Sequence, residues 1–466
     1  MKKEIIIILL CCLSFQAFST DNDTTKVATK SSEIVKKGYN FGPFPVIGFD
    51  ADKGFGFGAL LNIYNFGDGS TYPNPKEEWY MEASYFTKGT QLYLVSFDSK
   101  TLIPNIRTSI SAFCMIDNAL QFAGFNGYMS HYDYERVNAG VKDPNLSFYN
   151  PYYRVGRAKT YLKADFTGKI TDDGRLQWIA GYHFTWDKYS DMNIDGFNSN
   201  LDDNKKYDTN APTLFGQYKE WGIIPEELHN GGITSSIRAG LTYDSRDIEN
   251  NPGKGICATA QLIAAPEFLG STQGYYKYSL NYKQYIPIVY QKLTFAYRLL
   301  YQGTIGNSIP FYAMPAMNEI GKNYDKDAIG GYRTARGIMR NRVNALDMGF
   351  YNAELRWKFI EFRLWKQNIA FALSAFTDGA MSIRPYDLSF QAKESDFENI
   401  AAFNASKAAY DTYIKKGDKE DSLHLTYGGG LRFIMNNNFI LAAEAGMPVD
   451  KRDGNFCFYL SIGFAF

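Results

Sequence analysis

The chain ends with the stretch Cys457-Phe458-Tyr459-Leu460-Ser461-Ile462-Gly463-Phe464-Ala465-Phe466. Its apolar positions alternate with small or polar ones and are Phe458, Leu460, Ile462, Phe464 and Phe466. Successive side chains of a strand point to opposite faces, so this pattern fits a strand with lipid on one side. A strand of a soluble sandwich can alternate in the same way, but it rarely ends the chain on its most apolar edge, where termini fray. An aromatic residue closing an alternating strand is typical of a bacterial outer-membrane β-barrel.

The amino terminus has the features of an export signal. A short basic region, Met1–Lys3, precedes the apolar stretch Ile5–Leu13, and small residues then offer a cleavage site after about Ser19. The apolar stretch is well short of the ~20 residues that a membrane helix needs. A lipoprotein signal is disfavoured because Leu10 precedes Cys11, where a small residue is expected. The predicted domains are a signal peptide over 1–19, a short periplasmic segment over 20–40 and a barrel over 41–466.

Composition narrows the class further. Tyr and Phe each occur 35 times in 466 residues, and aromatic girdles at the two membrane interfaces account for such an excess in a barrel. The formal net charge is +0, so the chain has no electrostatic footprint for nucleic acid. Outside the signal, Cys114, Cys257 and Cys457 lie too far apart for a disulfide framework or a zinc pattern. We expect no metal, no cofactor and no nucleic-acid partner.

Period-two alternation recurs along the chain, in segments 160–167, 175–186, 236–244, 276–283 and 351–359. In each segment one face is apolar and aromatic, while the other carries charges and small residues. A hydrated lumen permits such a polar face, whereas a dry core would not. Runs of this kind number about sixteen after the signal, and closed bacterial barrels have an even number of strands. The sequence therefore predicts an all-β fold, a transmembrane antiparallel β-barrel.

Short turns alternate with long polar connections. Thr171–Gly174 and Met435–Asn438 are clear tight turns. The long connections are predicted at about 118–156, 188–232, 303–345 and 380–422. This asymmetry is typical of periplasmic turns and extracellular loops. Alanines at helical spacing over 397–416 predict a helical insertion in the last long connection.

The segment Gly330–Ile338, with the sequence Gly-Gly-Tyr-Arg-Thr-Ala-Arg-Gly-Ile, resembles the sixth-loop signature of the BamA/TamA/FhaC superfamily of surface-antigen barrels. That signature is a glycine pair, a short spacer and an Arg-Gly before an aromatic residue. Other segments resemble the family in its order and at compatible spacing; they are Pro45–Phe49, Gly54–Gly58, Leu241–Asp247, Asn251–Gly255, Tyr285–Ile288, Asn352–Arg356 and Phe376–Asp378. The resemblance covers nearly the whole barrel.

The resemblance implies that Arg336 folds into the lumen and contacts acidic residues of the twelfth and thirteenth strands. Alternation independently places Glu354 and Asp378 on the polar faces of those strands. An arginine between two carboxylates in a partly dehydrated lumen can make bidentate, charge-assisted hydrogen bonds. The glycines that would let the loop turn sharply and approach the wall are Gly330, Gly331 and Gly337. The alternative is ordinary lumen charges that happen to align; in either case we expect no catalytic role.

Two features depart from the family. Ile338 stands where the family has an aromatic residue and Ala335 where it has a β-branched one, which weakens the expected hold on the loop. Members that fold or export other proteins also carry periplasmic POTRA modules before the barrel. The segment 20–40 is too short for such a module, and its polar start predicts disorder. We therefore expect a member without POTRA domains.

The resemblance implies a role in outer-membrane protein insertion or translocation, with separate periplasmic or lipoprotein partners. In the family, a weak seam between the first and last strands lets the barrel open. The seam expected here joins Pro45–Asp50 to Phe456–Phe466, with the closing residues Phe458, Phe464 and Phe466. Unpaired backbone is costly in lipid, so such a seam could lower the barrier to strand insertion.

Two other classes compete with this hypothesis. A self-contained plugged channel or surface scaffold suits the aromatic external loops, and a homo-oligomer is compatible with it. An enzyme is disfavoured because the chain has only 4 histidines and neither a Gly-x-Ser-x-Gly elbow nor a His-Glu-x-x-His pair. The acidic stretch 195–208 lacks the ligand spacing of a calcium loop, which favours a solvated loop.

Overall fold

The computed structural model describes residues 34–50, 54–133, 150–198, 203, 206–317, 319, 326–462 and 466. The predicted signal peptide over 1–19 lies outside the described residues, as does most of the predicted periplasmic segment over 20–40. Phe464 lies outside them too. The described residues from Val35 onwards belong to one unit, which is a β-barrel.

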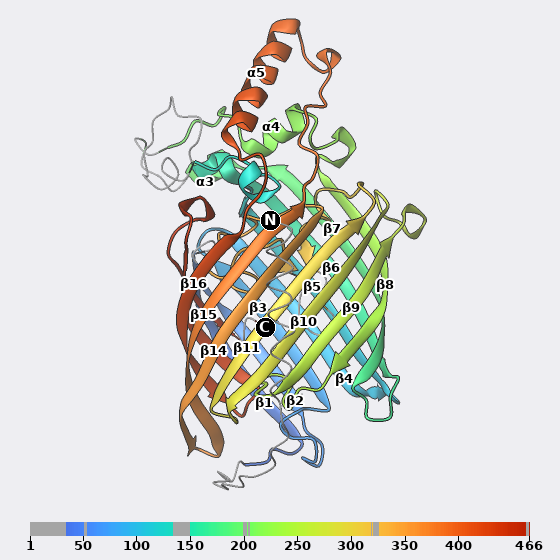
Figure 1. Cartoon of the computed structure of the whole chain (residues 1–466), viewed down its shortest axis with the longest axis vertical. Coiled ribbons are helices and arrows are strands. Elements are labelled where there is room, and N and C mark those ends of the chain that lie inside the picture. Colours follow the sequence, from blue (N-terminus) through green and yellow to red (C-terminus); the bar gives the residue numbers. More distant parts are fainter. Residues whose placement is uncertain are drawn as a thin grey trace. The chain divides into compact units, whose positions relative to one another are not determined.

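The barrel strands are β1 (Tyr39–Asp50), β2 (Gly54–Asn65), β3 (Glu77–Phe86), β4 (Thr90–Ile103), β5 (Ile106–Gln121), β6 (Arg154–Lys169), β7 (Leu176–Asp191), β8 (Gly231–Asp244), β9 (Gly255–Ala265), β10 (Tyr275–Val289), β11 (Leu293–Ile305), β14 (Asp347–Leu364), β15 (Gln367–Arg384), β16 (His424–Met435), β17 (Phe439–Pro448) and β18 (Cys457–Ile462). In the described part of the chain these 16 strands form one closed antiparallel sheet in which β18 meets β1. The tilted strands enclose a barrel (Figure 1). The predicted barrel of about sixteen strands is therefore confirmed.

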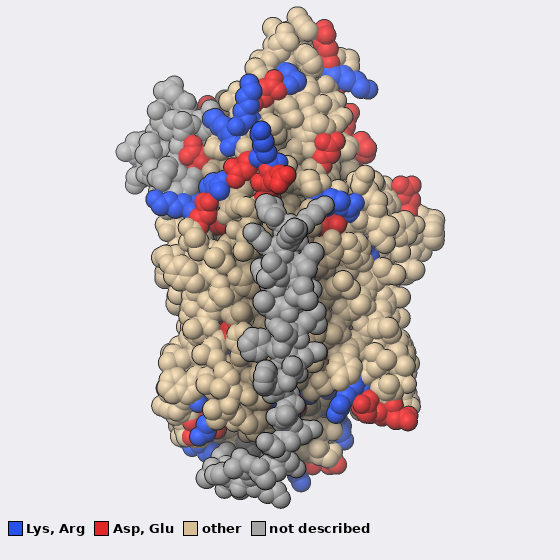
Figure 2. All heavy atoms as spheres, in the orientation of Figure 1, with Lys and Arg blue, Asp and Glu red and all other residues tan. Residues whose placement is uncertain are grey.

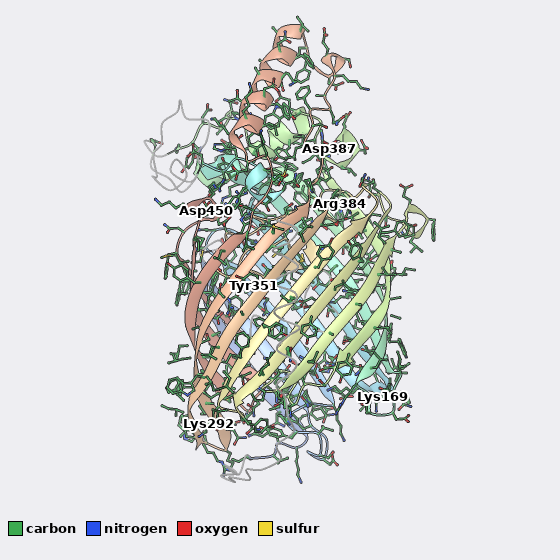
Figure 3. All side chains as sticks on the ribbon, viewed as in Figure 1. Lys169, Lys292, Tyr351, Arg384, Asp387 and Asp450 are labelled. Carbon is green, nitrogen blue, oxygen red and sulfur yellow. The ribbon has the colours of Figure 1, made fainter. Side chains whose placement is uncertain are left out.

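The faces of the strands follow the predicted alternation. On β7, Trp186 is 53% exposed and points outward, whereas on the neighbouring β6 the inward Lys163 is 1% exposed. On the face shown in Figure 2, charged residues gather towards the two ends of the barrel, and the band between them carries almost none. Tyr351 of β14 lies within this band, while Lys169 and Lys292 lie at one end of the barrel and Arg384 at the other (Figure 3). An apolar band between two charged rims is the surface that a lipid bilayer requires.

The two ends of the barrel differ in their connections. The short turns after β4, β6, β10, β14 and β16 lie at the end marked by Lys169 and Lys292 (Figure 3), together with the longer connections 66–76 and 245–254. The long connections follow β5, β7, β11 and β15 and span 122–153, 192–230, 306–346 and 385–423. The predicted connections are thus confirmed to within a few residues. The first end is the periplasmic one by the usual asymmetry of bacterial barrels, and the second is extracellular.

The extracellular connections carry the helices, which are η2 (Gly127–Met129), η3 (Asn150–Tyr153), α3 (Ile194–Asn198), α4 (Leu214–Glu220), η5 (Glu226–Leu228), η6 (Glu267–Leu269), η7 (Glu394–Asp396), α5 (Ile400–Lys416) and η8 (Lys451–Asp453). Helix α5 confirms the predicted insertion. It begins where the Asn399 side chain accepts the N–H of Ala402, and it ends with Lys415 and Lys416, whose charge suits a helix carboxyl end. None of the helices in the described ranges has the length and apolarity needed to cross a membrane.

The long connections share an aromatic core. Phe122 packs edge-on against Phe215 and Tyr218 of the next long connection, and Tyr218 meets Tyr413 of α5. Phe311, from the connection after β11, packs on Phe215. These side chains are almost fully buried, although they belong to connections and not to barrel strands. The four connections therefore form one structure, the external cap, over the extracellular end (Figure 1).

Candidate functional site

The sixth extracellular connection, 306–346, enters the barrel. Gly330, Gly331 and Gly337 have φ values of 129°, 86° and 94°, in the left-handed region that favours glycine. A Cβ atom on Gly330 would lie 2.0 Å from the backbone oxygen of Met339. The N–H of Gly331 donates to the oxygen of Ile338 at 2.8 Å, which closes the segment into a compact loop. The sequence thus forms a tight, inward loop that residues with side chains could not follow.

Arg336 lies at the centre of this loop and is fully buried. Its Nε and Nη2 atoms donate to the two carboxylate oxygens of Asp378 on β15, at 2.9 and 3.0 Å, and its backbone N–H donates to Asp378 at 2.9 Å. Nη1 donates to Glu354 on β14 at 2.7 Å. The guanidinium carbon lies 3.5 Å from the centre of the Phe376 ring. The structure therefore brings together the three residues that the sequence analysis singled out.

Three further charged residues complete the group. Glu444 of β17 lies 3.3 Å from Arg336, and Arg432 of β16 donates to both Glu354 and Glu444. Arg356 donates to Glu354 at 2.9 Å. We name this group the lumen ion cluster; its members are Arg336, Arg356, Arg432, Glu354, Asp378 and Glu444. Three arginines face three carboxylates, so the charges balance, and removal of one member would leave an uncompensated buried charge.

The opposite wall holds the same loop by other contacts. Arg298 of β11 forms an ion pair with Glu319, and the backbone oxygen of Glu319 accepts from Arg238 at 3.2 Å. Lys277 of β10 donates to the backbone oxygens of Ala313 and Met314 at 3.1 and 3.2 Å. The inward charges that the sequence predicted to be hydrated are thus buried against the loop. The lumen is plugged over the described residues.

Arg432 and Glu444 were missed in the sequence analysis. Alternation could have placed both on the inward faces of their strands, because each is the one charged residue of its strand. Sequence alone does not tell which inward charges meet across neighbouring strands. Their pairing depends on the register of β16 with β17, in which Arg432 faces Ala442 and Glu444 faces Gly430.

The predicted seam is only partly as expected. Phe458 packs towards Phe49 of β1, with ring centres 6.3 Å apart. Phe466 does not continue the lipid-facing side as predicted. Its ring lies 6.5 Å from that of Tyr285, and its backbone oxygen accepts from Arg356 at 3.1 Å. Tyr285 and Arg356 point into the lumen, so Phe466 lies inside the barrel. Alternation within one strand does not predict its contact with Arg356, because Arg356 belongs to another strand.

The seam between β1 and β18 is described over part of its length, because residues 463–465 lie outside the described ranges. In the described residues a single register position, Asp50 opposite Tyr459, joins the two strands. On its other side β1 pairs with β2 along its whole length, from Tyr39 to Asp50. At the periplasmic end Phe44 of β1 stacks instead on Phe439 of β17, with ring centres 3.9 Å apart and an interplanar angle of 10°. Among the described residues, the seam thus combines one registered pair with aromatic contacts from β1 to β17 and β18.

A second buried polar group lies where the cap joins the barrel. His424, at the start of β16, hydrogen-bonds Asp453 through Nδ1 at 2.5 Å and Asp421 through Nε2 at 3.0 Å. Tyr128 stacks on the imidazole at 3.8 Å and donates to Asp453 at 2.5 Å, and burial, with the help of Asp453, raises the pKa of this tyrosine. These contacts tie three connections together. In the described ranges no group of three or more His, Cys, Asp or Glu side chains could hold a metal ion.

The lipid-facing band, the plugged lumen and the capped extracellular end define an outer-membrane β-barrel with a loop bound inside it. The chain belongs to the Omp85 superfamily, whose domain model matches residues 122–466. It is accordingly a protein of the Gram-negative outer membrane.

Two solved structures are similar to the chain at low sequence identity. BamA from Haemophilus ducreyi lacking POTRA domains 1–3 is 15% identical, with 92% of this chain and 70% of that chain covered and a TM-score of 0.49. CdiB from Escherichia coli is 9% identical, with a TM-score of 0.52 and coverage of 92% of this chain. This chain spans 63% of the length of that CdiB. No curated protein matches the chain.

Proposed function

We propose that the protein inserts other proteins into the outer membrane, or translocates them across it, together with separate partner proteins. Membership of the Omp85 superfamily supports the general role. The observation that carries the proposal is the seam, where Asp50 opposite Tyr459 is the single register position between β1 and β18 in the described residues.

A weak seam has a physical use in a membrane. Each unpaired backbone group in hydrocarbon costs several kcal/mol, so a fully closed ladder opens rarely. In the described residues one register position joins β1 to β18, and if the seam opens, the freed edge of β1 could template an incoming strand. The seam also lies near the lumen ion cluster, because β17, which pairs with β18, carries Glu444 of that cluster. The barrel can therefore open locally while the loop stays bound.

The role needs no catalytic group, and we propose that the protein is not an enzyme. The buried charges of the lumen ion cluster are neutralised by one another and hold the loop. Periplasmic or lipoprotein partners would deliver the client proteins, and these partners are separate chains in our proposal.

A self-contained plugged channel or surface scaffold is the second candidate. It is favoured by the periplasmic end, where the connection 245–254 reaches across the barrel. Glu249 pairs with Arg107 at 2.6 Å, and Asn251 donates to Asn437, in the turn after β16, at 2.8 Å. With the external cap at the other end, both mouths are covered in this structure. A barrel that stays closed in this way would present its cap to an external partner.

The test is to lock the seam in the bacterium that makes the protein. Phe49 and Leu460, one step from the registered pair, would be replaced by cysteine after the native Cys114, Cys257 and Cys457 are changed to serine. The matched control is Phe41→Cys with Ile63→Cys, which face each other in the fully paired β1–β2 hairpin. The amounts of folded outer-membrane proteins and of secreted proteins are then compared under oxidising and reducing conditions.

The proposal expects a loss of folded or secreted proteins when the seam pair is oxidised. Reductant should restore them, and the hairpin pair should have no effect. Unchanged amounts with a fully oxidised seam would contradict an insertion or translocation role through this seam. In that case the plugged channel or scaffold becomes the better account.

A further inference from the structure

The hairpin of β14 and β15 extends past its neighbours at the periplasmic end. These two strands have 18 residues each and are the longest in the described barrel. Strand β11 pairs with β14 only as far as Trp357, and β16 pairs with β15 only as far as Ile369. Residues 359–367 therefore form a two-stranded projection, which we name the terminal ribbon (Figure 1).

The terminal ribbon is apolar on its outer face. Ile360 is paired with Phe371, and Phe362 with Ile369. Because paired residues share a face, and Phe371 is on the same face as the outward Leu373, these apolar side chains point outward. The exposed apolar residues of the ribbon are Phe359, Ile360, Phe362, Leu364 and Trp365. This surface continues the lipid-facing band of the strands without interruption.

The tip of the ribbon is chemically unusual. Trp365 is 86% exposed and, like Lys366 beside it, has a positive φ, at 47° and 62°. At this end of the barrel other tight turns place Asn105 and Asn436 in the same conformation, which asparagine tolerates well. A bulky tryptophan is a poor choice for such a turn. Strained positions of this kind persist where the side chain has a function of its own.

The charges near the tip complement a phospholipid surface. Within the ribbon Arg363 and Lys366 are the cations and Glu361 is the one carboxylate, so cations exceed anions by two to one, and Lys358 lies next to the ribbon. Tryptophan prefers the headgroup level of a membrane, where its ring is apolar and its N–H remains hydrated. Long cationic side chains reach from apolar surface to phosphate in the same zone.

We propose that the terminal ribbon is a membrane anchor that inserts in the periplasmic leaflet of the outer membrane. Its outer face lies in the acyl region, Trp365 lies at the headgroups, and Arg363 and Lys366 bind lipid phosphates. Since β14 and β15 also carry Glu354 and Asp378, the anchor fixes the depth of the wall that holds the loop arginine. The partner of this surface is thus phospholipid, and the anchor proposal does not depend on the proposed insertion role.

The test uses the full-length protein in vesicles of phosphatidylethanolamine and phosphatidylglycerol that contain a lipid brominated near the headgroup end of its chains. The protein has 6 tryptophans, so the Trp365 signal is obtained as the difference between the native protein and Trp365→Phe. Trp357→Phe gives the signal of the lipid-facing band, and Trp221→Phe that of the buried cap. Retained resistance to SDS before heating shows that each variant is folded.

The anchor predicts that bromine quenches the Trp365 signal at least as strongly as the Trp357 signal, and about threefold more than the Trp221 signal. Changing Arg363 and Lys366 to glutamine should reduce the quenching in vesicles with phosphatidylglycerol. An unquenched Trp365 signal would overturn the proposal. So would a signal that stays unquenched and shifts to the blue only after periplasmic proteins are added, because that result assigns the surface to a protein partner.

Discussion

The strands β14 to β17 and the seam between β18 and β1 are neighbours in one sheet, yet they are held by different means. Between β14 and β17 the ladders are long, and these four strands together with the loop that carries Arg336 form the lumen ion cluster. At the seam, one register position and two aromatic contacts join β1 to β17 and β18 in the described residues. This contrast indicates that the barrel opens more readily at the seam than between β14 and β17. Opening at the seam leaves every contact of Arg336 with the wall intact.

The two sides of the seam are also unequal. Strand β18 is bound to the lumen loop, because the Tyr459 hydroxyl accepts the N–H of Gly337 at 3.2 Å and its ring lies 5.7 Å from that of Tyr332. Strand β1 has a backbone ladder with β2 on its other side. Towards the seam its aromatic rings contact one side chain each of β17 and β18. If the seam opens, we expect β18 to stay with the loop and β1 to move away with β2.

The largest effect should come from breaking the strongly held region. Arg336→Ala leaves Asp378 and Glu354 buried with one cation fewer, and breaking a buried ion pair in this way costs about 3–5 kcal/mol. We expect a lower free energy of unfolding in urea, with the variant in lipid vesicles, and a loop that becomes accessible to protease. Arg175→Ala is the control, since Arg175 is exposed and 3.5 Å from Asp173. Equal stability of the two variants would contradict a structural role for the cluster.

A smaller loss of stability is expected when a carboxylate and the arginine it pairs with are both replaced. Glu444→Gln alone leaves Arg432 with one carboxylate fewer and should cost about 2–3 kcal/mol. Adding Arg432→Met removes the cation as well, so part of the loss should be recovered in the double variant. A double-mutant cycle, measured by unfolding in vesicles, gives the coupling between the two residues. Strict additivity would show that they do not act as one group.

The fold could be derived from the sequence to a large extent, but the site only in part. Alternation arises because lipid lies outside the wall and a polar lumen inside it. It therefore predicts strands such as β7 and β14, and the inward direction of Glu354. The external cap has no such period. Phe215 and Trp221 are buried by other connections, and nothing local in the sequence indicates that burial.

Contacts between distant segments were also out of reach. Arg336 could be assigned through its motif, but Glu444 meets it only because of the order and register of β17 in the sheet. Alternation predicts Phe466 on the lipid side, because its position continues a regular pattern. Its contact with Arg356, across the lumen, overrides that pattern. Period-two alternation therefore predicts which side chains of a strand point inward. It does not predict which inward side chains contact one another.

The weakly held region gives the smallest and most informative effect. Phe44→Ala removes the stacked contact with Phe439 that joins β1 to β17, and such aromatic pairs contribute about 0.5–1.5 kcal/mol. Global stability should change little, because the β1–β2 ladder and the lumen ion cluster are untouched. The N–H groups of β1 should, however, exchange with deuterium several-fold faster, since local opening depends on the few contacts of the seam.

The matched control for this change is Phe57→Ala. Phe57 packs on Tyr85 at 5.4 Å, but its strand is paired on both sides, with β1 and with β3. Its loss should cost a similar amount without faster exchange in β1. Faster exchange confined to β1 in Phe44→Ala would locate the moving edge on that strand. Equally faster exchange of the β18 N–H groups would mean that the loop does not hold the last strand. That result would contradict the expectation that β1 alone moves when the seam opens.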